Sequence, residues 1–220
     1  MNTRTRIKFC GITRAEDARA AVAAGADALG MVFFAKSKRA LTPQRAAEIR
    51  KIVPAFVDVV ALFVNPDPVY VQEIIDAVAP DILQFHGNES ADDCERYGMR
   101  YMKAFHMGAP GMDTSEDVLQ ACRRHPAACA WLFDTYSSGY GGSGRGFDHA
   151  LLERVRTTDD SLPLVLAGGL APDNVAQHVR ALSPYAVDVS SGIEIEPGIK
   201  SAAKMAAFSK AVQMADSRSI

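Results

Sequence analysis

Long apolar segments, paired cysteines and a strong net charge are all missing from this chain of 220 residues. No run approaches the roughly 18 consecutive apolar residues of a membrane-spanning helix, and the first residues, MNTRTRIKF, contain no apolar stretch typical of a secretion signal. The formal net charge of -2 argues against a nucleic acid or an anionic membrane as partner. These absences predict a cytoplasmic protein that binds neither nucleic acid nor a membrane.

Cysteine is scarce, and its spacing excludes two common uses. The four residues, Cys10, Cys94, Cys122 and Cys129, form no CxxC pair and show no spacing typical of zinc ligands. Without a secretion signal we expect reduced thiols rather than two disulfides. The histidines show no ligand spacing either, so the sequence predicts no metal site. No GxGxxG motif follows the first predicted strand, which excludes the commonest dinucleotide-binding motif.

Short apolar runs alternate with amphipathic, alanine-rich segments along the whole chain. Runs such as VVALFV are almost continuously apolar, as expected of strands that are buried on both faces. The predicted strands are Ile7–Ile12, Ala28–Phe34, Asp58–Val64, Ile82–His86, Tyr101–His106, Ala130–Asp134, Leu164–Gly168 and Ala186–Ser190. The predicted helices lie near 15–24, 43–53, 67–78, 90–97, 115–124, 148–156, 172–181 and 201–214. Pro43 and Pro172 each stand where proline favours a first helical turn.

Eight strand–helix units without a composition break that marks a linker favour an α/β fold, a closed (β/α)8 barrel of the TIM-barrel type. Such barrels often contain roughly 200–250 residues in one domain. We therefore expect residues 1–220 to form a single barrel domain. A doubly wound open sheet has the same alternation of elements and is the alternative fold.

Two residues at the ends of predicted strands could exchange protons with a substrate. Asp134 ends the run AWLFD, and such a carboxyl group is either a cap for the next loop or a general acid whose pKa is raised by its apolar setting. Cys10 ends the first strand and is either a buried small side chain or, as a thiolate, a base. Because the active site of a barrel lies where the carboxyl ends of its strands converge, the pair would supply one acid and one base.

Loops rich in glycine and serine follow the last two predicted strands. Gly168 and Gly169 follow the seventh strand, and Ser190, Ser191 and Gly192 follow the eighth. Barrels commonly bind phosphate at these loops, because glycine brings backbone N–H groups close to an anion at a helix N-terminus. Either loop alone could merely turn the chain, but two of them at adjacent strand ends predict a phosphate site.

Three more polar residues and one long loop belong to the same end of the predicted barrel. Arg39 in KSKRA is either a solvated surface residue or a guanidinium that holds a carboxylate. His86 ends a predicted strand, where it is either a packed imidazole or a residue near the substrate, and Asp188 lies close to the end of another. The loop DTYSSGYGGSGRGF, residues 134–147, is long and flexible enough to act as a lid over a ligand. Its central residues are Gly141, Gly142, Ser143 and Gly144.

Taken together, these stretches resemble the phosphoribosylanthranilate isomerase family of tryptophan biosynthesis. The resemblance runs along the whole chain, through KFCGIT, AGADALGMVF, KSKR, ALFVN, LQFHG, LFDT, GGSGRGFDH, LAGGLAPDNV and VDVSSGIE. The family often has proline where Lys38 stands and tryptophan where His149 stands. Neither of these two positions carries the chemistry of the family.

The resemblance implies an aldose–ketose isomerase that performs an Amadori rearrangement, from N-(5-phosphoribosyl)anthranilate to 1-(2-carboxyphenylamino)-1-deoxyribulose 5-phosphate. Asp134 would protonate the ring oxygen, and Cys10 would remove the proton from C2. Arg39 would hold the anthranilate carboxylate, the two glycine-rich loops the phosphate, and His86 and Asp188 would lie near the substrate. No metal or organic cofactor is expected, because the Schiff base already acidifies the C2 proton.

Two related activities and one role without turnover compete with this interpretation. The histidine-pathway sugar isomerase performs the same rearrangement on another aminoaldose, but that family has aspartate where Cys10 stands. The catalytic lysines of indole-glycerol-phosphate synthase have no evident match. A barrel that binds a phosphorylated metabolite without converting it is the alternative from another class. The expected partner is a small phosphorylated substrate, and the sequence leaves both a monomer and a homodimer open.

Overall fold

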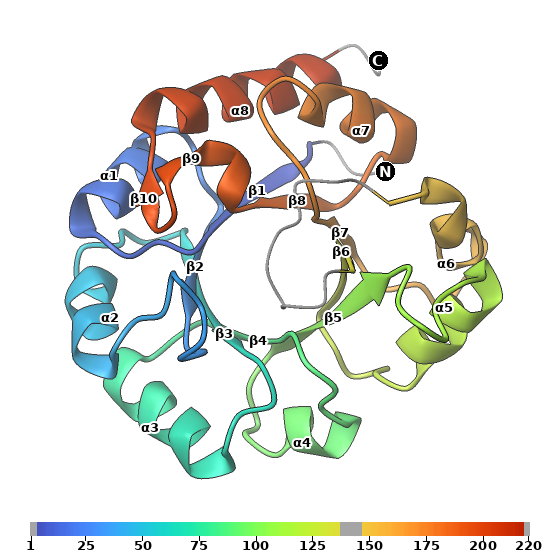
Figure 1. Ribbon diagram of the computed structural model, residues 1–220, viewed down its shortest axis with the longest axis horizontal. Coiled ribbons are helices and arrows are strands. Elements are labelled where there is room, and N and C mark those ends of the chain that lie inside the picture. Colours follow the sequence, from blue (N-terminus) through green and yellow to red (C-terminus); the bar gives the residue numbers. More distant parts are fainter. Residues whose placement is uncertain (1–3, 137–146, 218–220) are drawn as a thin grey trace.

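A closed barrel of eight parallel strands forms the centre of the computed structural model, which describes residues 4–136 and 147–217. The strands follow one another around the ring in chain order, and β8 lies beside β1. Helices surround the ring on its outside (Figure 1). The predicted (β/α)8 barrel is therefore confirmed, and the open sheet is wrong.

The strands of the barrel are short, and their pairing is parallel throughout. They are β1 (Arg6–Cys10), β2 (Ala28–Val32), β3 (Asp58–Phe63), β4 (Ile82–Phe85), β5 (Tyr101–Met107), β6 (Ala130–Thr135), β7 (Leu164–Leu166) and β8 (Ala186–Val189). A small antiparallel hairpin, β9 (Glu194–Glu196) and β10 (Ile199–Lys200), follows the last of them. The sequence does not predict this hairpin.

The helices begin and end close to the positions that the sequence predicts, with one exception. They are α1 (Ala15–Ala23), α2 (Pro43–Arg50), α3 (Pro68–Val78), α4 (Ala91–Glu95), α5 (Ser115–Arg123), α6 (Glu153–Thr157), α7 (Val175–Leu182) and α8 (Ala202–Asp216), with 3-10 turns η1 (His149–Leu152) and η2 (Ser191–Ile193). Pro43 begins α2, and the Thr42 side chain caps it. Pro172 does not begin α7, because the Asn174 side chain accepts from Ala171 N and donates to Gly169 O, each at 2.8 Å, and so holds a turn there.

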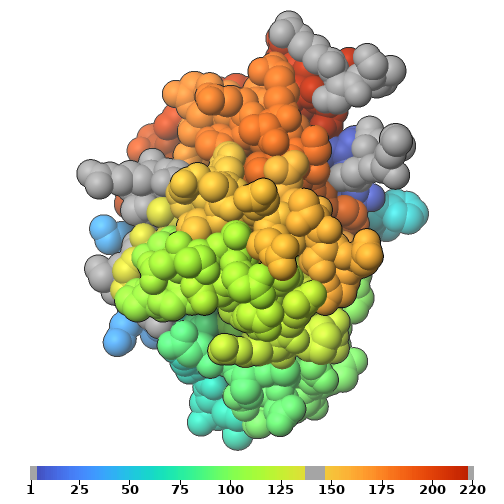
Figure 2. Space-filling model, turned by 90° about the vertical axis from the view of Figure 1, so that its right-hand side faces the viewer, coloured from blue at the N-terminus to red at the C-terminus, as the bar shows by residue number. Residues whose placement is uncertain are grey.

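Two apolar layers result from the alternation of side chains along each strand. Phe9, Phe85 and Trp131 belong to the larger layer, between the strands and the helices. Smaller side chains such as Val60 and Leu132 fill the inside of the ring. Figure 2 looks at the side of the molecule on which α5, α6 and α7 cover the strands. On β1, this alternation turns residues 7 and 9 outward and residues 8 and 10 inward.

The first strand and the last helix are fastened to each other as well. Thr5 donates to Asp216 twice, from its backbone nitrogen at 2.7 Å and from its hydroxyl at 2.8 Å. Together with the pairing of β1 and β8, these bonds close the barrel at the point where the two ends of the described chain meet. Over the described residues, no helix combines the length and the apolar character needed to cross a bilayer.

Candidate active site

A cleft opens inside the ring, at the carboxyl ends of the strands. Its lining contains most of the residues that the sequence singles out: Cys10, Arg39, His86, Asp134, Gly168, Gly169, Asp188, Ser190 and Ser191. Gly192 lies behind this lining, against the backbone carbonyl of Leu170. The predicted lid residues Gly141, Gly142, Ser143 and Gly144 lie outside the described residues. Side chains far apart in sequence therefore face one another across a single space.

Cys10 lies at the end of β1 and is 5% exposed. Its neighbour in the register of β2 is Gly30, a residue to which the sequence assigns no role. A Cβ atom at Gly30 would lie 2.8 Å from the sulfur of Cys10 and 3.1 Å from Nζ of Lys8. The missing side chain therefore makes the room in which the thiol and the ammonium group lie close together.

Lys8 and Asp188 form an ion pair inside the barrel, beneath Cys10. Nζ of Lys8 lies 2.9 Å from Oδ1 of Asp188, and both side chains are less than a tenth exposed. Burial lowers the pKa of Lys8, but Asp188 and Cys10 outweigh this effect, and the net pKa is raised. Lys8 therefore keeps its charge in the interior. The sequence does offer one signal for it: a lysine within an apolar run, two residues before the cysteine.

The surroundings of Cys10 favour the protonated thiol over the thiolate at neutral pH. Burial raises the pKa of Cys10, and the nearby Asp188 carboxylate raises it further. The positive charges of Lys8 and Lys200 lower the pKa without cancelling the rise. The net pKa of the thiol is above its usual value, so the thiolate is the minor form at neutral pH.

Asp134, at the end of β6, is held by two neighbours. The backbone nitrogen of Thr135 donates to Oδ1 at 2.7 Å, and Nε2 of His86 lies 3.3 Å from Oδ2. Burial raises the pKa of Asp134, but the neighbouring imidazoles of His86 and His106 and the Thr135 N–H group outweigh it, and the net pKa is lowered. The raised pKa that one of the two sequence interpretations assigns to Asp134 is therefore wrong, because polar groups just after β4 and on β5 and β6 surround the carboxylate.

His86 is positioned by two residues to which the sequence assigns no role. Nδ1 of His86 lies 3.2 Å from Nε2 of Gln84, and Nε2 of His106 donates to the backbone oxygen of His86 at 2.8 Å. The two imidazole rings are 4.9 Å apart and meet edge to face. Burial lowers the pKa of His106, which keeps that ring neutral. His86 therefore presents Nε2 to Asp134 in a fixed orientation.

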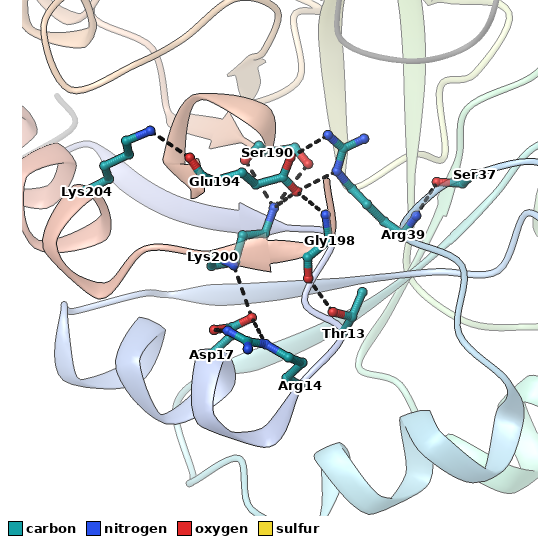
Figure 3. A network of polar contacts seen from close by, with 10 residues as sticks. All are labelled: Thr13, Arg14, Asp17, Ser37, Arg39, Ser190, Glu194, Gly198, Lys200 and Lys204. Atoms are coloured by element: carbon teal, nitrogen blue, oxygen red, sulfur yellow. Dashed lines mark hydrogen bonds and ion pairs between the residues drawn. The ribbon is translucent and has the colours of Figure 1, made fainter. Parts of the chain in front are cut away.

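Arg39 belongs to a network of charged groups at the rim of the cleft (Figure 3). Its Nε and Nη2 atoms donate to the two carboxylate oxygens of Glu194, each at 2.7 Å. Lys200 lies 2.9 Å from the same carboxylate and donates to the backbone oxygen of Ser190 at 3.1 Å. Arg39 is therefore not a solvated surface residue. Its Nη1 edge is not used by Glu194.

The two glycine-rich loops lie side by side along one wall of the cleft. Gly168 and Gly169 have φ angles of +84° and +65°, which favour glycine. A Cβ at Gly168 would lie 2.7 Å from the Thr135 nitrogen, and one at Gly192 would collide with the carbonyl of Leu170. The segment after β8 is a 3-10 turn rather than a longer helix. Both loops thus bring backbone close to the space between them, as an anion site requires.

The geometry combines a thiol, a carboxyl group, a guanidinium and a glycine-rich cradle around one space. No group of three or more His, Cys, Asp or Glu side chains in the described part of the chain is arranged to hold a metal ion. Such a site can bind a substrate with two anionic ends and move protons on the atoms between them.

Comparison with known proteins gives a consistent result over nearly the whole chain. The family model described as N-(5'phosphoribosyl)anthranilate (PRA) isomerase matches residues 7–211. The N-(5'-phosphoribosyl)anthranilate isomerase of Bordetella pertussis is 58% identical over 213 residues, which are 97% of this chain and 98% of that protein.

Two solved structures share the fold of the chain closely. The phosphoribosyl anthranilate isomerase of Thermotoga maritima is 37% identical, with a TM-score of 0.85 over 96% of this chain and 99% of that one. The second is a phosphoribosyl anthranilate isomerase in complex with reduced 1-(o-carboxyphenylamino)-1-deoxyribulose 5-phosphate. It is 34% identical, with a TM-score of 0.82 and the same coverage of 96% and 99%.

Proposed function

The chain belongs to the N-(5'-phosphoribosyl)anthranilate isomerase family, and we propose that Cys10 and Asp134 are the base and the acid of the rearrangement that it catalyses. The protein is an aldose–ketose isomerase of tryptophan biosynthesis. One observation carries the proposal: the thiol and the carboxyl group line the same cleft, together with Arg39 and the two glycine-rich loops.

Asp134 starts the reaction by giving a proton to the ring oxygen of the sugar. The bond between that oxygen and C1 then breaks, and the nitrogen lone pair of the anthranilate forms the double bond of a Schiff base. The positive charge on the Schiff base acidifies the proton on C2. This step leaves Asp134 as a carboxylate, the form that its hydrogen bond from Thr135 N stabilises.

Cys10, as a thiolate, then takes the proton from C2. The electron pair of the broken C–H bond moves toward the nitrogen and yields an enolamine, which becomes the ketone when C1 gains a proton and the hydroxyl on C2 loses one. The hydrogen atoms of substrate and product balance, so the reaction needs no external oxidant or reductant. A base of moderate strength is sufficient for a proton already acidified by the neighbouring cation.

The two anionic ends of the substrate fix its sugar between the acid and the base. Gly168, Gly169, Ser191 and Gly192, with Ser190, bind the phosphate through backbone N–H groups. Arg39 binds the anthranilate carboxylate through Nη1, because Glu194 already engages Nε and Nη2. His86 and Asp188 lie beside the sugar. Holding both ends contributes to the rate by orienting the reacting atoms.

Substitution of the two proposed proton carriers tests this function. We expect Cys10→Ala and Asp134→Asn to lower kcat by roughly 10²–10⁴-fold, while the affinity for the reduced product analogue stays within a few-fold of wild type. Turnover is followed by the fluorescence of the anthranilate group, and binding by titration of the analogue. Cys129→Ala and Asp160→Asn, outside the cleft, are the matched controls and should retain full activity.

Two results of this experiment would reject the assignment. Near-normal turnover in either cleft variant would mean that another group carries the proton. An equal loss of turnover and of analogue binding would mean that the residue serves binding alone. A wild-type protein that binds the analogue but converts no substrate would favour the barrel without turnover.

Three further properties are part of the proposal. We infer that residues 1–220 form one domain, that the protein works in the cytoplasm on a small phosphorylated substrate, and that it is a monomer or a homodimer. Reduced cysteines, expected from the sequence, support the location. Sedimentation velocity over a range of concentrations distinguishes the two oligomeric states, because only the dimer dissociates on dilution.

A further inference from the structure

The ion pair beneath Cys10 has no role in the proton transfers described so far. We propose that Lys8 is a positioning residue that holds the Cys10 thiolate, and that Asp188, through its charge on Lys8 and Cys10, limits how readily this thiolate forms. This inference rests on the proposed role of Cys10 as the base. It assigns no contact with the reacting atoms to either member of the pair.

The backbone of β1 directs Lys8 toward the sulfur. Residues 8 and 10 lie on the same face of a strand, because successive side chains alternate. On the neighbouring strand, Gly30 has no side chain to fill the space beside them. The sulfur lies 2.8 Å, and Nζ of Lys8 3.1 Å, from the position that a Cβ atom of Gly30 would occupy. Two groups so close to one point can form a charge-assisted hydrogen bond once the thiol loses its proton.

Charged groups face Cys10 from four parts of the fold. They are Lys8 on β1, Asp188 on β8, Lys200 on β10 and Arg39 in the loop after β2. Lys200 and Arg39 are both paired with a carboxylate of their own, that of Glu194, at 2.9 Å and 2.7 Å. Lys8 is paired as well, with Asp188, but its Nζ also shares the space beside Gly30 with the sulfur. It is therefore the cation best placed to compensate a negative charge on sulfur.

Asp188 has an effect on the thiolate that is opposite to that of its partner. The carboxylate keeps Lys8 charged through a contact of 2.9 Å, but its own negative charge repels a thiolate nearby. Removal of the cation should therefore make the thiolate harder to form, and removal of the anion should make it easier. A merely structural role of the pair predicts the same disturbance from both changes.

The pH dependence of Cys10 alkylation measures this difference directly. Substrate-free enzyme is treated with iodoacetamide over a range of pH, and mass spectrometry of the peptide that carries Cys10 gives the rate at that thiol alone. We expect Lys8→Met to raise the midpoint of this pH dependence by about one pH unit and to slow alkylation of Cys10 about tenfold near neutral pH. Asp188→Asn should lower the midpoint, and Lys8→Arg should bring it back toward wild type.

A second buried lysine provides the matched control. Nζ of Lys103 lies 3.0 Å from Glu89, and both side chains are as buried as those of Lys8 and Asp188, but the pair lies outside the cleft. Lys103→Met should leave the midpoint of Cys10 unchanged. A shift in this control equal to that of Lys8→Met would show a general effect of core disruption and overturn the proposal.

The remaining outcomes decide the proposal as well. It is overturned if Lys8→Met fails to raise the midpoint or if Asp188→Asn fails to lower it. Should Lys8→Met not fold, the direction of the Asp188→Asn shift decides alone. Alkylation requires no turnover, so its result can be separated from a test of the proposed function. An active Cys10→Ala variant would refute the role of Cys10 as the base, but it would not change the alkylation midpoints of the other variants.

Discussion

The pKa shifts of Cys10 and Asp134 favour protonation states opposite to those that their proposed roles require. Burial keeps the thiol protonated through a raised pKa, and His86 with its neighbours keeps the carboxyl group ionised through a lowered pKa. The reactive form differs from the resting form only by transfer of one proton from sulfur to carboxylate. Both forms carry the same number of protons, so their ratio does not change with pH between the two pKa values.

This arrangement predicts a broad plateau in the pH profile of kcat/KM. Below the lowered pKa of Asp134 both groups are protonated, and activity falls because no thiolate remains. Above the raised pKa of Cys10 both groups are ionised, and activity falls because no acid remains. The measurement is kcat/KM from about pH 4 to about pH 10 in constant ionic strength. A single titration near 6.5, the usual pKa of histidine, would contradict this assignment.

At the residue scale, the sequence predicts the positions of the site residues but not their protonation. The positions of Cys10 and Asp134 can be predicted because each residue stands at the end of an apolar run, and such a run indicates a buried strand. The pKa of Asp134 depends on His86 and on the backbone of Thr135, and this contact is a product of barrel closure. The spacing of Lys8 and Cys10 is visible in the sequence, whereas their common space beside Gly30 is not.

Among the elements, the hairpin of β9 and β10 is the one that joins the glycine-rich loop after β8 to the loop after β2. Glu194, on β9, binds Arg39 from the loop after β2 and Lys200 from β10 (Figure 3). Thr13, in the loop after β1, donates to the backbone oxygen of Gly198 at 2.5 Å and fastens the hairpin turn. One carboxylate therefore fixes two cations that belong to different elements.

Loss of that carboxylate should weaken the fold in a pH-dependent way. Burial raises the pKa of Glu194, but Arg39 and Lys200 outweigh it, and the net pKa is lowered in the folded state. A carboxyl group with a lowered pKa stabilises the fold at pH values above its unfolded pKa, and this stabilisation is lost as the pH falls through the folded pKa. Glu194→Gln should therefore cost about 3 kcal/mol at pH 7, and much less in acid.

Urea unfolding at neutral pH and near pH 3 measures the difference. The matched control is Glu48→Gln, which removes an exposed pair with Arg45 of 2.8 Å. Exposed pairs contribute at most about 1 kcal/mol, so this variant should follow the wild type at both pH values. An equal loss of stability in the two variants would show that the Glu194 network is no stronger than a surface ion pair.

The sequence predicts the barrel strands better than the hairpin, for a physical reason. All eight runs are long and apolar enough to be recognised. The largest differences are at the carboxyl ends of β1, β2 and β7, each of which ends two residues before the predicted position. Strands β9 and β10 contain only three and two residues, with polar side chains. They are held by side chains of other elements, and no local pattern of the sequence records such contacts.

At the scale of the whole molecule, the barrel has one continuous apolar layer between strands and helices. A single domain of this kind should unfold in one cooperative transition. Trp131 is the only tryptophan of the chain and lies buried on β6, so its fluorescence reports on the packing of this layer.

We therefore expect thermal unfolding followed by Trp131 fluorescence and by far-ultraviolet circular dichroism to give the same midpoint. The two signals report tertiary packing around β6 and helix content around the whole ring, respectively. Midpoints that differ by more than the experimental error would show that parts of the barrel unfold separately, and would contradict the single domain.

The hydrogen bonds between Thr5 and Asp216 hold the residue before β1 against the carboxyl end of α8. Every strand of a closed barrel has two neighbours, and β1 and β8 are neighbours like any other pair. A peptide linker across this seam, combined with a new opening in an outer loop such as that between α5 and β6, would leave all eight adjacencies as they are. The architecture is thus compatible with circular permutation, because the closed ring gives no pair of neighbouring strands a special place.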